Sequence, residues 1–241
     1  MCSISVYRAG VQYPGAMGIG HVAVGLGLKR VEPRVNAGLL IFAAFLADFL
    51  LGWFTWAGWE NYEVPADYAT AHFLLFTFPW SHGLLPDIVW ATALGWAIGT
   101  VMRSGRAGIV TGIAVLSHYL LDGLVHVKGL PVAGPDSPSF GLGWWRYLPF
   151  ELTLEAAMVA AGIVLYWGVA KTQTRARRVG MAAFTVLLAL LTIWGQATAT
   201  VAPPRSALVA NWIAAPVVFA AIAGFIDLRK REKALELNSG R

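Results

Sequence analysis

Cysteine and charge are what this sequence has least of. Its 241 residues include one cysteine, Cys2, which excludes an internal disulfide and any metal site built from several cysteines. Charged residues make up 13% of the chain, whereas an ordinary soluble domain has about 25%. This shortage excludes a disordered chain and a typical soluble enzyme. The net charge of +5 does not indicate nucleic-acid binding, because the basic residues fall in short clusters between apolar runs.

Apolar residues are what the chain has in excess. Hydrophobic residues reach 57%, which leaves too little polar surface to enclose such a core in water. The natural solvent of the chain is therefore a lipid bilayer, and membrane lipids are its expected surroundings. Residues 1–14 lack a compact apolar run, so we expect no cleaved signal peptide and a retained first helix.

Seven apolar segments approach the length of about 20 residues that a spanning helix needs. They are 13–28, 35–58, 86–102, 107–127, 149–170, 179–200 and 207–227. The apolar piece 68–78 is too short to span, so we interpret 68–85 as a re-entrant segment, with a short eighth spanning helix as the alternative. The expected fold is all-α: a polytopic helical membrane bundle of about seven transmembrane helices plus the re-entrant segment. Residues 1–227 would form a single membrane domain, and residues 228–241 a short charged cytoplasmic tail.

Basic residues gather between these segments in a pattern that orients the chain. With seven helices and a re-entrant segment, four basic clusters fall on the same side of the membrane. They are Lys29/Arg30/Arg34, Arg103/Arg106, Lys171/Arg175/Arg177/Arg178 and Arg229/Lys230/Arg231/Lys233. The positive-inside rule assigns that side to the cytoplasm. We therefore expect the N-terminus outside and the C-terminus in the cytoplasm.

Ionisable side chains within the apolar segments carry the functional signal, because burying a charge in a bilayer costs several kcal/mol. Five of them are similar in kind: His21, Asp48, His82, His118 and Asp122. His118 and Asp122 are four residues apart, which places them on one helix face, where such a pair can chelate one ion. The other three are the candidates to complete the site from elsewhere in the chain. Mixed histidine and aspartate ligands suit zinc, with manganese or iron as alternatives, better than calcium.

Each of these residues also has a plainer interpretation. A single buried histidine is more often a hydrogen-bonded packing residue than a ligand, and Asp48 alone could serve helix packing. His118 and Asp122 could simply neutralise each other, and a proton or ion path is a further alternative. Three histidines and two aspartates in one small apolar protein favour a metal site over these alternatives.

Two glutamates four residues apart, Glu151 and Glu155, open the segment 149–170. Glu155 lies deeper, and a carboxylate beside a metal can act as general base for a bound water, so Glu155 is the predicted catalytic residue. Glu151 fits a first-turn acid that the helix dipole favours. His72, in the re-entrant segment, could be a sixth ligand or a partner of one.

Four short motifs together resemble a known pattern. They are Gly20-His21, Leu46-Ala47-Asp48, Trp80-Ser81-His82-Gly83-Leu84-Leu85 and Leu116-Ser117-His118-Tyr119-Leu120-Leu121-Asp122. Over roughly residues 16–150 the chain resembles the bacterial family of predicted membrane-bound metal-dependent hydrolases. The family commonly has a Pro-Asp-x-Asp-His cluster where this chain has Ala47-Asp48-Phe49-Leu50-Leu51, which favours one metal ion over two. The resemblance implies a metal-dependent hydrolase of the bacterial inner (plasma) membrane.

The sequence thus predicts a hydrolase that cleaves a lipid or lipid-linked ester or phosphoester from the outer half of the bilayer. The loop 128–148, rich in glycine and proline, could form a lid over the site. The competing interpretation is non-enzymatic: a metal or proton transporter, or a structural protein, that uses the same buried cluster. A transporter needs polar residues that continue to the cytoplasmic side, and the inner halves of these segments have almost none.

Overall fold

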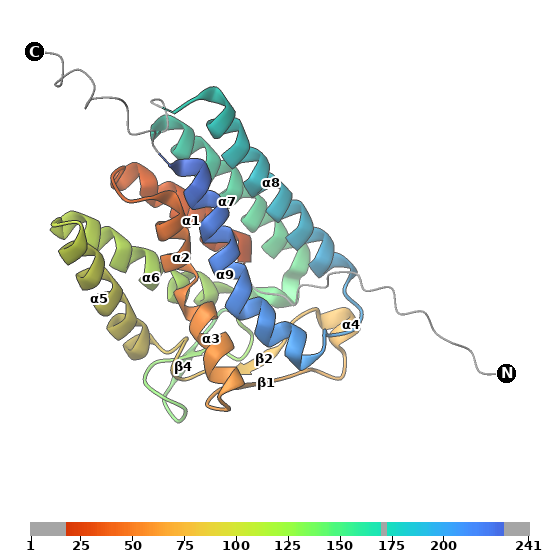
Figure 1. The fold of residues 1–241 in the computed structure, drawn as a ribbon. Helices are drawn as coiled ribbons and strands as arrows, with labels where there is room; N and C mark the ends of the chain where they lie inside the picture. Colours follow the sequence, from red (N-terminus) through yellow and green to blue (C-terminus); the bar gives the residue numbers. More distant parts are fainter. Residues whose placement is uncertain (1–17, 170–172, 229–241) are drawn as a thin grey trace, which may run out of the picture.

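The computed structural model describes residues 18–169 and 173–228. Helices dominate it and pack into one bundle (Figure 1). They are α1 (Gly18–Val31), α2 (Ala37–Ala44), α3 (Leu46–Trp56), α5 (Leu84–Val101), α6 (Gly105–Val125), α7 (Leu148–Val169), α8 (Arg175–Thr198) and α9 (Arg205–Asp227). The predicted helix start at residue 13, Lys171 and the charged tail after residue 228 lie outside the described residues.

The number of membrane spans differs from the predicted seven. Five helices, α5 to α9, are long and apolar enough to cross a membrane. The successive helices α2 and α3 are bent by 51° and make a sixth span if they are taken as one broken helix. The described part of α1 has 14 residues, which is too short to span, and it packs against α2, α6, α7 and α8 inside the bundle. The structure therefore confirms an all-α fold with several possible membrane spans and does not support a count of seven.

The break between α2 and α3 falls at Phe45, which leaves the helical region with φ −101° and ψ 7°. Its backbone N–H still bonds the carbonyls of Ile41 and Phe42, so the chain bends without losing this turn. The break brings the carbonyl of Ala44 within 2.7 Å of a ring nitrogen of His118 on α6. Local departures from regular α-helical geometry are often found at functional positions.

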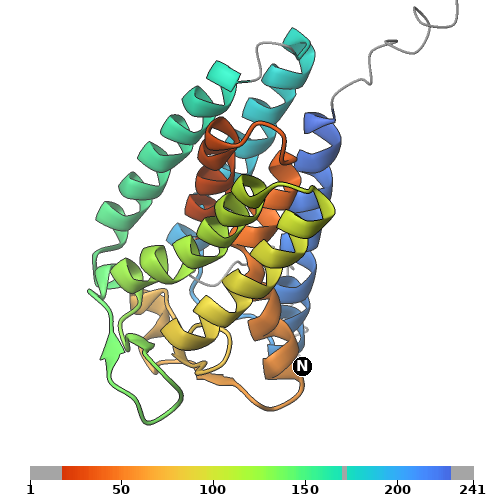
Figure 2. The ribbon, with the colours of Figure 1, turned by 90° about the vertical axis from the view of Figure 1, so that its left-hand side faces the viewer.

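Among the described residues, the strands and the shortest helices lie at one end of the bundle, which we call the capped end (Figures 1 and 2). It contains α4 (Tyr68–Ala71), the 3-10 helix η1 (Trp144–Tyr147) and two small antiparallel sheets. One sheet pairs β1 (Asn61–Glu63) with β2 (Leu75–Thr77), and the other pairs β3 (Leu130–Pro131) with β4 (Ser139–Phe140). The segment 68–83 is thus a short helix, a strand and a turn, and the alternative of an eighth spanning helix is wrong. Its depth in the membrane stays a prediction.

The opposite end, which we call the basic end, gathers the α1–α2, α5–α6 and α7–α8 connections and the end of α9 (Figure 1). Two hydrogen bonds join the first two connections: Arg34 Nη2 donates to Ser104 Oγ at 2.8 Å, and Arg106 Nη2 donates to the Val31 carbonyl at 2.6 Å. The basic residues of the described connections therefore share one end of the molecule. That this end faces the cytoplasm stays a prediction.

Glycines allow the closest helix contacts. A Cβ on Gly95 of α5 would lie 2.8 Å from the carbonyl oxygen of Gly108 on α6, so only glycine fits there. Gly162 of α7 meets the backbone of Ala23 on α1 in the same way, at 2.8 Å. Small residues at such crossings let backbones pack directly in a membrane, where no hydrophobic effect drives helices together. The contact at Gly162 brings α7 directly against α1, the helix that carries His21.

Candidate metal centre

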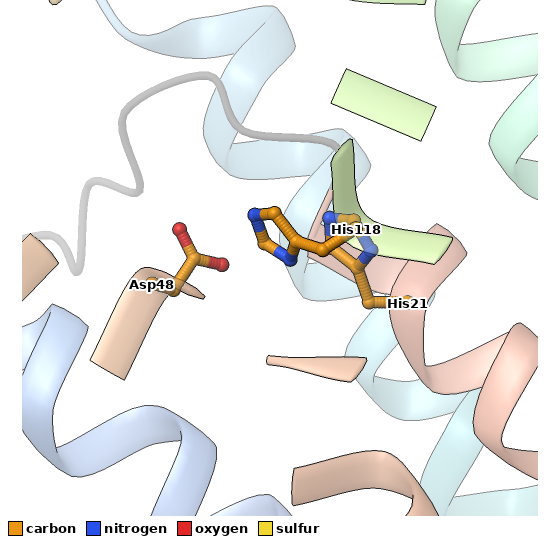
Figure 3. A group of neighbouring side chains, drawn as sticks. All are labelled: His21, Asp48 and His118. Atoms are coloured by element: carbon orange, nitrogen blue, oxygen red, sulfur yellow. The ribbon is translucent and has the colours of Figure 1, made fainter. Parts of the chain in front are cut away.

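Four separate parts of the chain bring the five predicted ligands together. They are His21 on α1, Asp48 on α3, His82 in the turn before α5, and His118 and Asp122 on α6. All five side chains are buried. Figure 3 shows His21, Asp48 and His118 pointing toward one another from three different helices. The i, i+4 spacing of the α6 pair is what places both of its side chains on the buried face of that helix.

Asp122 lies at the centre of this group. Its Oδ1 is 3.2 Å from His21 Nε2, and its Oδ2 is 3.3 Å from His118 Nε2 and 3.6 Å from His82 Nε2. A fourth histidine, His126, also approaches Oδ2, with its Nε2 at 3.0 Å. The predicted ligand set left out His126, although its position four residues after Asp122 was a signal for it. We call these six residues the His–Asp cluster: His21, Asp48, His82, His118, Asp122 and His126.

Two overlapping trios within the cluster have the geometry of a metal site. One is His82, His118 and Asp122, and the other is His21, Asp48 and His118; in each, the ligand atoms lie within 4.8 Å of one another. In the first trio the three distances are 3.0, 3.3 and 3.6 Å. Bonds of about 2.0–2.1 Å in a tetrahedral zinc site place ligand atoms roughly 3.3 Å apart. The first trio therefore already has the spacing of three corners of such a site.

Hydrogen bonds fix which ring nitrogens can bind a metal. The Ala44 carbonyl can only accept, so His118 donates through its Nδ1–H, and the Nε2 of the neutral ring carries a lone pair. On His82, Nδ1 lies 2.7 Å from Ser81 Oγ, and Ser81 Oγ donates to Glu60 Oε2 at 2.6 Å. With the hydroxyl hydrogen directed to Glu60, Ser81 accepts from His82 Nδ1–H, and His82 Nε2 is also left with a lone pair. Metal-ligating histidines are held by such partners on their other nitrogen.

The carboxylate of Glu60 anchors this chain of hydrogen bonds. Its Oε1 accepts from the backbone N–H groups of Trp80 and Ser81, both at 2.8 Å. Burial raises the pKa of Glu60, while the hydrogen bonds from Ser81 and Trp80 oppose that rise. The residue stands in the connection between α3 and β1, so the turn that carries His82 is fastened to a different part of the capped end. Sequence reasoning missed this role, because nothing in the spacing of Glu60 and Ser81 indicates their contact.

The two ring nitrogens with lone pairs face each other. His82 Nε2 and His118 Nε2 are 3.0 Å apart in a buried site, where two acceptors repel unless a proton or a cation lies between them. Among the described residues, the ion-pair partners of Asp48 and Asp122 are histidines, with no lysine or arginine within 4 Å. Two buried carboxylates without a fixed cation carry a large desolvation cost. A divalent cation would offset both the repulsion and the charge, so the residues present fit a metal ion.

Further buried carboxylates surround the cluster. Asp87 on α5 and Glu155 on α7 are close enough to Asp122 to interact with its charge. Glu155 Oε1 accepts a long, 3.4 Å hydrogen bond from the backbone N–H of Gly20, next to His21, while its Oε2 has no hydrogen-bond partner in the described chain. Both oxygens of Asp87 and of Glu151 also lack such partners there. The sequence predicted Glu155 in this region but gave no weight to Asp87.

The remaining sequence predictions concern His72 and the loop 128–148. His72 follows α4 and belongs to neither trio, so within the described residues it is no candidate ligand. The loop packs on the capped end: the Trp145 ring lies 4.1 Å from the ring of His126, and Leu142 N–H bonds the carbonyl of Gly123 at 2.8 Å. It therefore covers the cluster from that end.

Comparisons of the chain with protein-family models, with curated proteins and with solved structures gave no match. The resemblance to membrane-bound metal-dependent hydrolases therefore stays a hypothesis based on short motifs.

Proposed function

We propose that this protein is a membrane-embedded, metal-dependent hydrolase with one divalent ion in the His–Asp cluster. The observation that carries the proposal is the 3.0 Å separation of His82 Nε2 and His118 Nε2, each of which is left with a lone pair by its hydrogen bonds. Asp122 completes a three-ligand face, and Asp48 Oδ1, 3.8 Å from His82 Nε2, is the fourth ligand. Zinc suits this set best, with manganese or iron as alternatives.

The other residues of the site have positioning roles. His21 contacts Oδ1 of Asp122 and His126 contacts Oδ2, so the two rings fix the orientation of the central carboxylate. The Ala44 carbonyl orients His118, and Ser81 with Glu60 orients His82. Partners of this kind set the tautomer and the direction of a ligand, and their loss typically weakens metal binding about 10–100-fold.

A divalent ion bound there supplies Lewis acidity, which polarises an ester or phosphoryl oxygen and acidifies water. Glu155 is the proposed general base, because it is buried, its Oε1 accepts from the backbone N–H of Gly20, which precedes His21, and its Oε2 has no hydrogen-bond partner in the described chain. The substrate we propose is a lipid or a lipid-linked ester or phosphoester. Five helices of the bundle, α6 with His118 and Asp122 among them, are long and apolar enough to cross a bilayer, which supports a substrate that dissolves there.

Metal content tests the proposal first. Protein purified in detergent without chelator, with zinc or manganese supplied, is analysed by elemental mass spectrometry beside a His118→Ala/Asp122→Ala variant. We expect near-stoichiometric metal in the wild type and its loss in the folded variant.

His72→Asn is the matched control, because it removes a histidine outside both trios, and asparagine tolerates the left-handed backbone there (φ 58°). It should keep its metal. A wild type without metal would contradict the metal site and leave proton handling or a structural role.

Hydrolysis tests the enzymatic part. The metal-loaded protein is screened against long-chain acyl esters and phosphodiesters of p-nitrophenol in mixed micelles. If Glu155 is the base, Glu155→Gln should lower the turnover number about 10²–10⁴-fold and keep the metal. Glu151→Gln is the matched control one helical turn away, and it should change the rate much less. Equal losses in both variants would assign the effect to helix packing and remove Glu155 from the chemistry.

A further inference from the structure

A cleft between α8 and α9 reaches the His–Asp cluster from the side of the bundle. It has a volume of about 70 Å³, and its walls come from α1, the α2–α3 break, α3, α8 and α9. Asp48 belongs both to the cleft and to the cluster. Its side chain is 12% exposed, whereas those of His21, His82, His118 and Asp122 are 1–6% exposed. The cleft is therefore where the cluster is most accessible.

The lining of the cleft changes in polarity along the bundle. Near the capped end, α8 contributes Thr192 and Gln196, and the antiparallel α9 contributes Asn211. Farther from that end, α8 contributes Leu188 and α9 contributes Phe219. Two helices that run in opposite directions thus give the same order, polar toward the capped end and apolar toward the middle. An amphiphile with its head toward the capped end and its chain toward the middle matches this order.

Pro216 adds an acceptor to the polar part of the cleft. It lies inside α9 and lines the cleft. Proline has no N–H, so the carbonyl of Trp212, four residues earlier, loses its usual helical partner. Trp212 and Asp48 both line the cleft, so this carbonyl belongs to the same wall region as the carboxylate of Asp48. Proline in a membrane helix is tolerated where another group can satisfy the freed carbonyl.

Aromatic side chains close the route from the capped end. Phe76, Phe78 and Trp145 are buried there. The ring of Phe78 lies 4.5 Å from that of His82, and the ring of Trp145 lies 4.1 Å from that of His126. A second pocket at this end is lined by Lys128, Ser137 and neighbouring residues, and no member of the cluster lines it. Of these two pockets, the lateral cleft is the one that a cluster residue lines.

We propose that this cleft binds a single bilayer lipid, with its polar head at Asp48 and its acyl chain between α8 and α9. A volume of about 70 Å³ is that of roughly two water molecules, so it holds the head-proximal atoms, and the rest of the chain lies along the mouth among bilayer lipids. Lateral access brings an apolar substrate to the cluster without passing through water. The identity of the bond that is cleaved rests on the proposed function, whereas lipid binding in the cleft does not.

Photo-crosslinking tests the cleft directly. The full chain in vesicles is irradiated with a phosphatidylglycerol that carries a diazirine near the head-proximal end of one acyl chain, and labelled residues are located by mass spectrometry. We expect labels on the inward-facing residues Thr192, Gln196 and Asn211. Ala215→Trp, which fills the cleft, should lower that labelling roughly tenfold. Val218→Trp, on the exposed face of α9 outside the lining, is the matched control and should leave it unchanged.

Two further arms separate the possible failures. The His118→Ala/Asp122→Ala variant should still be labelled in the cleft, so a failure of the metal site does not remove the lipid site. Ser137→Trp fills the pocket at the capped end and should have no effect. Labels restricted to exposed faces such as Val218, in a wild type that binds metal, would overturn the cleft and leave the hydrolase proposal standing. Loss of cleft labelling in Ser137→Trp but not in Ala215→Trp would assign access to the capped end.

Discussion

Two buried aspartates in this protein have opposite surroundings. At the basic end, Asp227 is held by what we call the Asp227 clamp: Lys29, Ala37, Tyr166 and Gln173. Lys29 Nζ and the backbone N–H of Ala37 donate to its Oδ2 at 2.6 and 2.8 Å. Tyr166 and Gln173 donate to its Oδ1 at 3.0 and 2.7 Å. The carboxylate thus accepts hydrogen bonds from four donors, one of which, Lys29, carries a positive charge.

Asp122, in the His–Asp cluster, has no such complement. Its neighbours are the four ring nitrogens of His21, His82, His118 and His126, and a second carboxylate lies within the same cluster. Two of those nitrogens face each other as acceptors. Both aspartates are buried, so burial alone does not identify a functional site. The Asp227 clamp includes a lysine and joins α1, α2, α7 and α9, whereas the described ion-pair partners of the cluster's aspartates are all histidines, which suits the cluster to a cation.

The largest effect that would sharpen this comparison is on stability at the clamp. Lys29→Met leaves the carboxylate of Asp227 buried without its cation, which typically destabilises a protein by about 3–5 kcal/mol. We expect the free energy of unfolding, measured by titration from mild detergent into sodium dodecyl sulfate, to fall by that amount. Metal bound per folded molecule should not change, because the clamp and the cluster share no residue.

The matched control for the clamp is Lys128→Met. Lys128 is at the capped end, where its Nζ donates to Thr77 Oγ1 in an exposed contact. Its replacement should change the free energy of unfolding by less than about 0.5 kcal/mol. A Lys29→Met protein that keeps its stability but loses metal would break the distinction between a structural and a functional cluster.

The sequence predicts the long helices, but it does not predict where a helix bends or how many helices span the membrane. Apolar length predicts the long helices, because a bilayer imposes that length on any span. It does not predict the break at Phe45, since no proline or glycine stands there and tertiary contacts decide the bend. It also overcounts spans at α1, whose apolar residues reflect burial inside the bundle as much as contact with lipid. Hydrophobicity alone cannot distinguish these two environments.

In the candidate site too, the sequence predicts some features and misses others. Histidine and aspartate in apolar segments could be found from the sequence, because their burial is costly and therefore unusual. The partners that orient them could not. Glu60 acts across 21 residues on Ser81, and the Ala44 carbonyl acts across 74 residues on His118. Contacts of this kind depend on how the elements pack, and no local pattern encodes them.

A smaller effect is expected from the hydrogen bonds that run from Glu60 through Ser81 to His82. Glu60→Gln keeps the shape of the side chain but removes the charge that receives the Ser81 hydroxyl, so His82 is oriented less firmly. Metal affinity, measured by competition with a coloured chelator, should weaken about 10–100-fold while the protein stays folded. The matched control is Glu63→Gln, which changes an exposed glutamate on β1. This variant should bind metal like the wild type. If both variants match the wild type, His82 is not held as a ligand and the comparison with the Asp227 clamp loses its basis.

The smallest effect concerns a third carboxylate, that of Glu32 at the basic end, which is itself buried but pairs with the exposed side chain of Arg34. Hydrogen bonds from the Arg34 side chain hold the pKa of Glu32 at about 2, below its ordinary value of 4.5. A carboxylate with a lowered folded-state pKa stabilises the protein above about pH 4.5, and this contribution is lost as the pH falls through about 2.

Arg34 is largely exposed, so Glu32→Gln should lower the free energy of unfolding by only about 1 kcal/mol or less at pH 7. The gap between Glu32→Gln and the wild type should close as the pH falls from 4.5 toward 2, whereas Asp136→Asn, in an exposed loop, should show no such gap. A gap that stays constant with pH would mean that Glu32 stabilises the protein through packing and not through its charge.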